Sequence, residues 1–148
     1  MRAVIQRVKN ANVKIDEKII GEINEGLLVY LGFTEGDNEE DFSYMENKIL
    51  NLRIFSDDEG KMNLSCKDIG GELLLVSQFT LYADGRKGRR PSFSNALGGD
   101  EARKLYDDFV ERMKKSIKVE TGEFGGDMKV SSINDGPVTI LLDSSKLF

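Results

Sequence analysis

The sequence predicts a mixed α and β domain in which two main helices flank a largely antiparallel sheet. Seven or eight short apolar segments have the character of strands, and most are separated only by brief turn signals. Two longer segments instead repeat apolar residues at intervals of three and four, as helices do. Strands joined by short turns favour antiparallel pairing, since parallel neighbours need a long crossover. We expect a single domain over residues 1–148.

The first part of the chain is expected to form two β-hairpins. Residues 2–8 alternate in polarity and indicate a strand, and Asn10–Asn12 indicate a turn after it. A second strand begins at Val13 and turns again at residues 16–18. Together these hairpins predict a meander. The continuous apolar run over residues 27–33 then indicates a central strand.

Two segments have the periodicity of amphipathic helices. The first covers residues 42–52 and follows an acidic stretch, in which Asp37 or Asn38 is the expected N-cap. The second covers residues 102–113, with Asp100 as its expected N-cap. Apolar stripes at this spacing more often face a core than a ligand, so both are assigned to the interior.

A buried strand leads directly into a polar end and a basic loop in the middle of the chain. Residues 73–76 are uniformly apolar, and Ser77, Gln78 and Thr80 follow them. Ligands of open sheets often lie beyond such strand ends. The next loop carries four cations that suit a phosphate, namely Arg86, Lys87, Arg89 and Arg90. Strand-end hydroxyls are also common as hydrogen-bonding caps, and charge runs as solvated loops, so these residues alone leave both interpretations open.

Shorter elements complete the chain. Residues 62–66 suit a short strand or an irregular segment, and Cys66 has no neighbouring base to activate it, so it is assigned a structural role. Residues 128–133 indicate a strand, Asn134–Pro137 a turn, and residues 138–142 a last strand.

Composition excludes several kinds of chemistry. The chain has no histidine, which removes Ser-His-Asp and Cys-His nucleophiles and most catalytic zinc sites. One cysteine excludes an intrachain disulfide. Any hydrolysis would therefore rely on backbone donors, hydroxyls, carboxylates or a group of the substrate, and we expect neither metal nor cofactor.

The charge and hydropathy of the chain indicate which partners and which cellular location to expect. A formal net charge of −5 argues against a protein that coats nucleic acid, although it allows a local basic contact. No apolar run is long enough to span a membrane, and the first residues do not resemble a secretory signal. We therefore expect a cytoplasmic protein without a membrane partner.

Five blocks of the sequence carry distinctive motifs, namely Met1–Val8, Ser77–Ala83, Gly88–Phe93, Phe124–Met128 and Asn134–Thr139. Taken together, these blocks resemble the D-aminoacyl-tRNA deacylase family, in its D-tyrosyl-tRNA deacylase form. The likeness covers nearly the whole chain. Its two signature motifs are the Ser-Gln-x-Thr sequence that begins at Ser77 and the Asn-x-Gly-Pro-Val-Thr sequence that begins at Asn134, and their joint occurrence at this spacing is highly specific. One departure is Gly126, where relatives often have alanine, and it concerns local packing only.

The resemblance implies a barrel-like twisted sheet and a homodimer with active sites at the subunit interface. Each site would combine the strand end of one chain with Gly136 and Pro137 of the other. That Gly-Pro bond is cis in the family, and its carbonyl oxygens act as a gate that admits D-residues or glycine and rejects L side chains. Arg7 would hold this segment, while Phe124 and Met128 would line the pocket near the terminal adenosine of tRNA. The residues assigned to catalysis are Ser77, Gln78, Phe79 and Thr80.

The implied activity is hydrolysis of the ester bond of D-aminoacyl-tRNA, or of glycine mischarged on tRNA. The products are free amino acid and tRNA, and the consequence is chiral proofreading in translation. Two mechanisms stay open: Thr80 and nearby backbone N–H groups polarise the carbonyl while the ribose 2′-hydroxyl helps activate water, or Thr80 acts as the nucleophile. The alternative function is a noncatalytic RNA-binding dimeric module that uses the basic loop.

Overall fold

Eight strands, two α-helices and one short 3₁₀-helix make up residues 1–148 in the computed structural model. The helices are α1 (Glu39–Asn51), η1 (Phe79–Tyr82) and α2 (Gly99–Lys114). The strands are β1 (Arg2–Ile15), β2 (Lys18–Ile23), β3 (Gly26–Gly32), β4 (Phe55–Ser56), β5 (Met62–Leu64), β6 (Glu72–Ser77), β7 (Val119–Thr121) and β8 (Lys129–Asp143).

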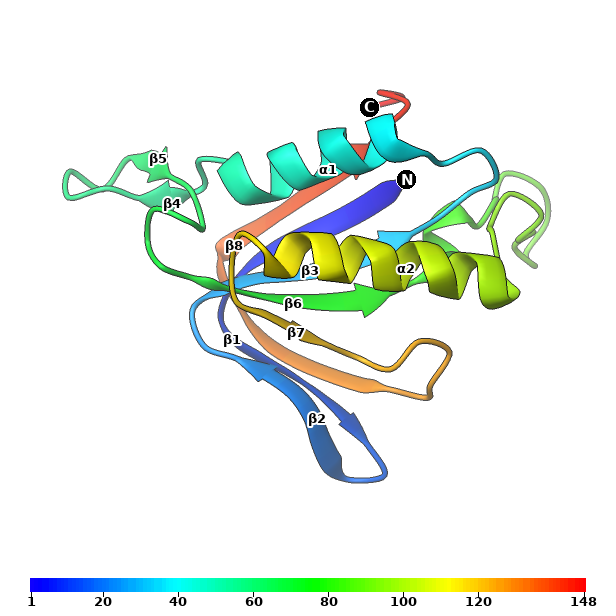
Figure 1. The fold of residues 1–148 in the computed structure, drawn as a ribbon, viewed down its shortest axis with the longest axis horizontal. Helices are drawn as coiled ribbons and strands as arrows, with labels where there is room; N and C mark the ends of the chain where they lie inside the picture. The colour runs from blue at the N-terminus through cyan, green and yellow to red at the C-terminus, as the bar shows by residue number, and fades with distance from the viewer.

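Six of the strands form one mixed sheet that curls into a nearly closed barrel (Figure 1). The strand order is β2-β1-β3-β6-β7, and β8 pairs with β1. All pairings of β1 are antiparallel, whereas β3 with β6 and β6 with β7 are parallel. Closure brings β2 against β7, since a Cβ on Gly21 would lie 2.3 Å from the Thr121 carbonyl oxygen. The predicted two-helix, barrel-like fold is confirmed.

The predicted meander is wrong, because β1 runs straight through the expected turn at Asn10–Asn12. Its first half pairs with β3 and its second half with β2. The expected turn at Asn134–Pro137 likewise lies within one continuous strand, β8. Both strands keep partners on each side of these residues, so the turn-forming sequences are absorbed into the sheet rather than reversing the chain.

Both sets of turn-forming residues mark irregularities in the pairing of β1 with β8. Gln6 pairs with Thr139 and Val8 with Asn134, so two steps along β1 correspond to five along β8. From Val8 to the next pair, Ala11 with Ser132, the extra residue is on β1. A bulge of this kind bends the strand and turns local side chains and carbonyls out of the ladder.

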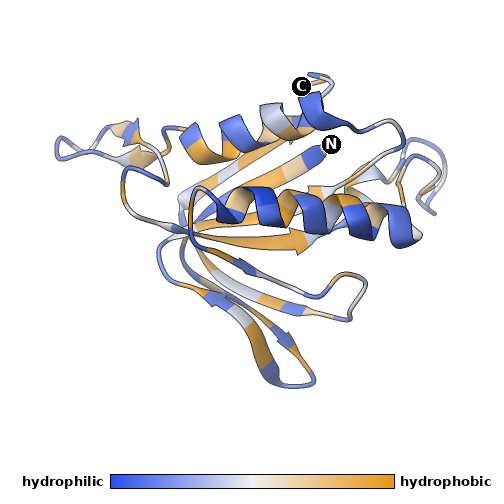
Figure 2. Ribbon diagram, in the orientation of Figure 1, coloured by the Kyte–Doolittle hydropathy of each residue, from blue (hydrophilic) through white to orange (hydrophobic).

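The two α-helices cover one face of the sheet (Figure 1). Phe42 of α1 packs edge-on against Phe109 of α2, with ring centroids 5.3 Å apart. Arg112 joins the helices through ion pairs with Glu39 and Glu46. Hydrophobic residues of both helices face the sheet and hydrophilic residues face outward (Figure 2). Neither helix is long and apolar enough to cross a membrane.

One N-cap prediction is confirmed and one is wrong. Asn38 caps α1, and its side chain accepts a hydrogen bond from the Glu40 N–H. Helix α2 begins earlier than expected, at Gly99, with Gly98 as its N-cap. Asp100 therefore lies in the first turn, where its negative charge still faces the positive end of the helix.

The interior consists of two apolar clusters, one on each face of the sheet. The larger contains 20 buried residues and lies between the sheet and the two helices. The smaller contains seven and lies inside the curl formed by β1, β2, β3 and β6. Residues 73–76 contribute to both clusters, as the uniformly apolar sequence of this strand predicts.

Candidate active site

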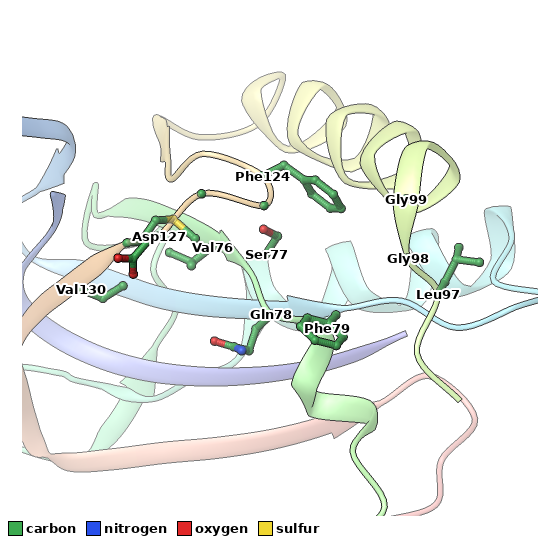
Figure 3. Close-up of a pocket in the computed structure, with 13 residues that line it drawn as sticks. Val76, Ser77, Gln78, Phe79, Leu97, Gly98, Gly99, Phe124, Asp127 and Val130 are labelled. Atoms are coloured by element: carbon green, nitrogen blue, oxygen red, sulfur yellow. The ribbon is translucent and has the colours of Figure 1, made fainter. Parts of the chain in front are cut away.

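A cavity of about 530 Å³ opens at the carboxyl end of β6 (Figure 3). Ser77 lies between the Phe124 ring on one side and the Phe79 ring on the other. The cavity is lined by Val76, Ser77, Gln78, Phe79, Leu97, Gly98, Gly99, Phe124, Gly125, Gly126, Asp127, Met128 and Val130. It therefore combines the end of β6, the start of α2 and the segment that leads into β8.

The wall from β6 is held rigidly where the strand turns into η1. The Gln78 backbone N–H donates to the Leu31 carbonyl at 2.7 Å, which extends the pairing with β3 by one residue. The Gln78 side-chain amide donates to the Thr80 hydroxyl. Thr80 is exposed and lies beside the cavity rather than in its lining. The Arg2 side chain, from β1, donates to the Leu81 carbonyl at 3.1 Å and so fixes η1.

The opposite wall is the segment that contains Phe124 and Met128. Phe124 packs against the ring of Tyr106 in α2, with centroids 5.8 Å apart, and the Arg103 guanidinium lies 5.0 Å from its centroid. Met128 fits closely because Gly122 has no side chain: a Cβ there would lie 2.5 Å from the Met128 sulfur. Contacts from α2 and from this glycine thus set the width of the cavity.

Gly126 is the one position that departs from the family pattern, and its neighbours show what an alanine would meet there. A Cβ at this position would lie 3.1 Å from the Ile15 Cδ1 atom and 3.3 Å from the Glu123 carbonyl oxygen. An alanine would need small shifts of both neighbours, so glycine here matches the large isoleucine opposite it.

Arg7, Gly136 and Pro137 lie in a different part of the same chain and do not line the cavity. The nearly buried Arg7 donates to the Ile54 carbonyl at 2.5 Å and to the Asp135 carbonyl at 3.3 Å, and pairs with the Asp135 carboxylate at 3.2 Å. Gly136 has a φ of +117°, and a Cβ there would lie 2.8 Å from an Arg7 nitrogen, so this position needs glycine. The Gly136–Pro137 bond is cis, and both residues are exposed.

The basic loop is exposed, and its four cations are not equivalent. Arg86 makes a two-pronged ion pair with Asp84, at 2.9 and 2.7 Å. This arginine holds the pKa of the Asp84 carboxyl well below its usual range. The remaining three, Lys87, Arg89 and Arg90, have no ion-pair partner within the chain and are free to meet an anion.

The cavity contains few groups that can exchange a proton. Asp127 is its one ionisable lining residue, and that carboxylate pairs with Lys129 at 2.8 Å. Cys66 is buried elsewhere, and burial raises the pKa of its thiol to about 12. No three His, Cys, Asp or Glu side chains gather closely enough to hold a metal ion. The groups that this chain offers at the cavity are therefore hydroxyl, amide and backbone groups and the one carboxylate of Asp127.

The cavity also includes residues that the sequence motifs did not identify. Leu97, Gly98 and Gly99 line it because α2 begins at its edge. Two adjacent glycines at 98 and 99 interrupt the sequence before the predicted helix, but no sequence pattern shows which part of the sheet they meet. Asp127 and Val130 belong to segments that were identified, without a role in the lining.

Comparisons with known proteins show the family to which the chain belongs. The family model described as D-Tyr-tRNA(Tyr) deacylase matches residues 4–143. The chain is 62% identical to the D-aminoacyl-tRNA deacylases of Clostridium kluyveri and of Thermosipho africanus, over the full length of both chains in each case.

Two solved structures have the same fold. The c-Myc DNA unwinding element binding protein is 40% identical, with a TM-score of 0.92 over 97% of this chain and 98% of its own. A probable eukaryotic D-amino acid tRNA deacylase is 20% identical, with a TM-score of 0.81 over 95% and 97%, a likeness of fold alone.

These likenesses define the class of the protein, which is a hydrolase that acts on ester bonds. The chain belongs to the D-aminoacyl-tRNA deacylase family, and the resemblance inferred from its motifs is confirmed.

Proposed function

We propose that this protein hydrolyses the ester bond between a D-amino acid and the terminal ribose of tRNA, and that it also removes glycine mischarged on tRNA. The products are free amino acid and tRNA, so the activity serves chiral proofreading in the cytoplasm. The observation that carries this proposal is the cavity at the end of β6. It places Ser77, Gln78 and Phe79 opposite Phe124 and Met128, without a histidine or thiol nucleophile.

Two copies of the chain form the complete site in this proposal. Gly136 and Pro137 project at the surface, outside the lining of their own chain's cavity, so they are available to the cavity of a partner. Strand β8, which carries them, has β1 as its one partner and exposes Ile133 and Leu141 by more than half. An edge strand with exposed apolar side chains is suited to an interface between subunits.

Selection against L-residues follows from an obstruction made of backbone atoms. The two mirror images bury equal apolar area, so contact area cannot distinguish them. Backbone carbonyls of Gly136 and Pro137, held by Arg7 from behind, would collide with an L side chain whatever its type. D side chains and glycine would escape the collision, and the specificity for D-residues would be broad.

The proposed chemistry uses carbonyl polarisation rather than an enzyme nucleophile. Because Gln78 donates to the Thr80 oxygen, the Thr80 hydroxyl proton is left to donate to the ester carbonyl. The N–H groups of Phe79 and Thr80 lie at the start of η1, where the first N–H groups of a helix have no partner within it. The 2′-hydroxyl of the substrate then helps activate water, while Phe124 and Met128 contact the terminal adenosine.

Turnover of matched substrates tests the function directly. The protein is incubated with D-Tyr-tRNA and with L-Tyr-tRNA, and release of the amino acid is measured. We expect hydrolysis of the D-substrate alone. Equal hydrolysis of both, or binding of tRNA without hydrolysis, would sink the proposal and favour a noncatalytic RNA-binding module.

A second pair of measurements separates the two mechanisms. We expect Thr80→Ala to lower the rate of hydrolysis by about 100-fold, the usual effect of losing one donor to a developing oxyanion. A substrate without the 2′-hydroxyl should also react slowly with the unaltered enzyme. Full activity of Thr80→Ala would exclude both roles of Thr80, whereas normal turnover of the 2′-deoxy substrate would favour the nucleophile.

A further inference from the structure

Two aromatic rings stand exposed at the edge of the cavity. Phe79 is 52% exposed and Phe93 is 41% exposed, although large apolar side chains are usually buried. Their ring centroids are 5.2 Å apart and their planes are inclined at 51°. Phe79 also lines the cavity, so the pair extends the cavity wall outward along the surface.

The basic loop is built so that it ends at this aromatic pair. Asp84 and Ser92 exchange two backbone hydrogen bonds, of 2.7 and 2.9 Å, which close the loop at its base. Phe93 follows this closure directly, and its carbonyl accepts a hydrogen bond from the Ala96 N–H at 3.0 Å. The aromatic pair therefore lies between the cavity and the closed end of the loop.

The same closure determines which cations are available. Arg86 is occupied by Asp84 at the base of the loop, whereas Lys87, Arg89 and Arg90 extend beyond it without partners. Three free cations stand out on a chain whose formal net charge is −5. An anionic partner would be attracted to this loop and repelled by most of the remaining surface.

We propose that Phe79, Phe93 and the three free cations form a binding surface for unpaired nucleotides that precede the esterified one. Every base has a flat face that stacks on an aromatic ring, and each such contact contributes substantially to the binding of single strands. The cations would contact the phosphates that link these nucleotides. This inference rests on the proposed function, because it extends the path of the substrate outward from the cavity.

An unpaired strand suits this surface better than a duplex. In an A-form helix the base faces are stacked on one another and are inaccessible to a protein ring, whereas unpaired bases can be splayed onto aromatic side chains. Two adjacent exposed rings beside cations thus point to single-stranded RNA. A second copy of the chain is the other candidate for an exposed apolar pair, and the experiment distinguishes the two.

The test measures binding of a short unesterified RNA with a single-stranded 3′ end, with a blunt duplex of the same length for comparison. We expect Phe93→Leu to weaken binding of the single strand about tenfold and to leave the salt dependence unchanged. Arg89→Gln and Arg90→Gln should each lower the slope of log affinity against log salt by about 0.7. Tyr44→Leu is the matched aromatic control, because this half-buried ring of α1 lies beside Lys48 and Lys146 and does not line the cavity, and it should bind as the unaltered protein does.

Other results would overturn the inference. Equal affinity for single strand and duplex, or unchanged binding by Phe93→Leu, would show that the rings do not stack on bases. A changed sedimentation coefficient of Phe93→Leu with unchanged RNA binding would assign the pair to a contact between subunits. A separate assay tests the proposed function alone, namely hydrolysis of a D-aminoacyl ester of adenosine by the unaltered protein. That substrate has no preceding nucleotides, so its hydrolysis does not depend on the proposed binding surface.

Discussion

Arg7 combines a nearly buried position with a full charge and three polar contacts. Its guanidinium connects β1 to the Ile54 carbonyl and to both the carbonyl and the carboxylate of Asp135. Removal of the side chain would leave the buried Ile54 carbonyl without this donor, which is more costly than loss of an exposed pair, whereas the partly exposed Asp135 carboxylate keeps Lys9 at 3.6 Å.

We therefore predict that Arg7→Ala lowers the free energy of unfolding by about 2–3 kcal/mol. Arg7→Lys should have an intermediate effect, because a single ammonium cannot reproduce the fork of a guanidinium. Urea denaturation of both variants measures the change. A loss below about 0.5 kcal/mol for Arg7→Ala would mean that water replaces these contacts at little cost.

Burial of the Cys66 thiol should make the free energy of unfolding fall as the pH rises above about 8. The folded thiol keeps its proton until about pH 12, because it is buried, whereas an unfolded thiol ionises near pH 8.5. Its contribution is thus fully present below the unfolded pKa and is lost as pH rises towards the folded one. The stability of the unaltered protein relative to Cys66→Ala should fall by about 1–2 kcal/mol between pH 8 and pH 10. Urea denaturation at both pH values tests this, and a constant difference would contradict it.

Individual residues were predictable where a motif fixed them and unpredictable where the fold placed them. Ser77, Phe79 and Phe124 belong to family motifs, and they surround one cavity. Gly98 lines the same cavity only because α2 begins beside β6, a long-range consequence of packing that leaves no pattern in the local sequence.

The same division holds for helices and strands. Helix α1, its Asn38 cap and the buried strand β6 follow from periodicity and apolar content. The continuity of β1 and β8 does not, because turn-forming residues have the same local preference in a turn and in a bulge. The pairs that β1 and β8 form before and after these residues decide between the two, and they join segments that lie far apart in the sequence.

Closure of the barrel depends on the contact between β2 and β7. Gly21→Ala would place a methyl group 2.3 Å from the Thr121 carbonyl oxygen, and backbone on both sides leaves little room to adjust. We predict a loss of about 1–3 kcal/mol of stability, typical of overpacking. Gly85→Ala is the matched control, because a Cβ there has no neighbour within 4 Å. Thermal or urea denaturation compares them, and equal effects would show that the barrel opens without cost.

In the proposed dimer, each of the two active sites contains residues from both chains. A chain with Thr80→Ala keeps its Arg7 and its Gly136 segment, while a chain with Arg7→Ala keeps its Thr80. If each site combines both chains, a mixed dimer has one intact site. We predict that each variant alone has little activity, Arg7→Ala because the Gly136 segment that completes the partner's site is no longer held in place. Mixing after subunit exchange should restore about a quarter of the activity of the unaltered protein, since about half of the dimers are mixed and each has one intact site.

Deacylation of D-Tyr-tRNA by the mixture measures this restoration, and copurification of the two variants through different tags measures the share of mixed dimers. A mixture of two differently tagged Thr80→Ala chains is the control and should remain inactive. Restoration near zero, with mixed dimers present, would mean that Thr80 and the Gly136 segment act within one chain.

The bulge in β8 also limits how this chain can change in length. Three extra residues between the pairs at Asn134 and Thr139 keep Val138, Ile140 and Leu142 turned toward the interior. Deletion of a single residue there would reverse the inward and outward alternation of the rest of the strand. A change of length between these two pairs therefore keeps the alternation of β8 only when it adds or removes an even number of residues.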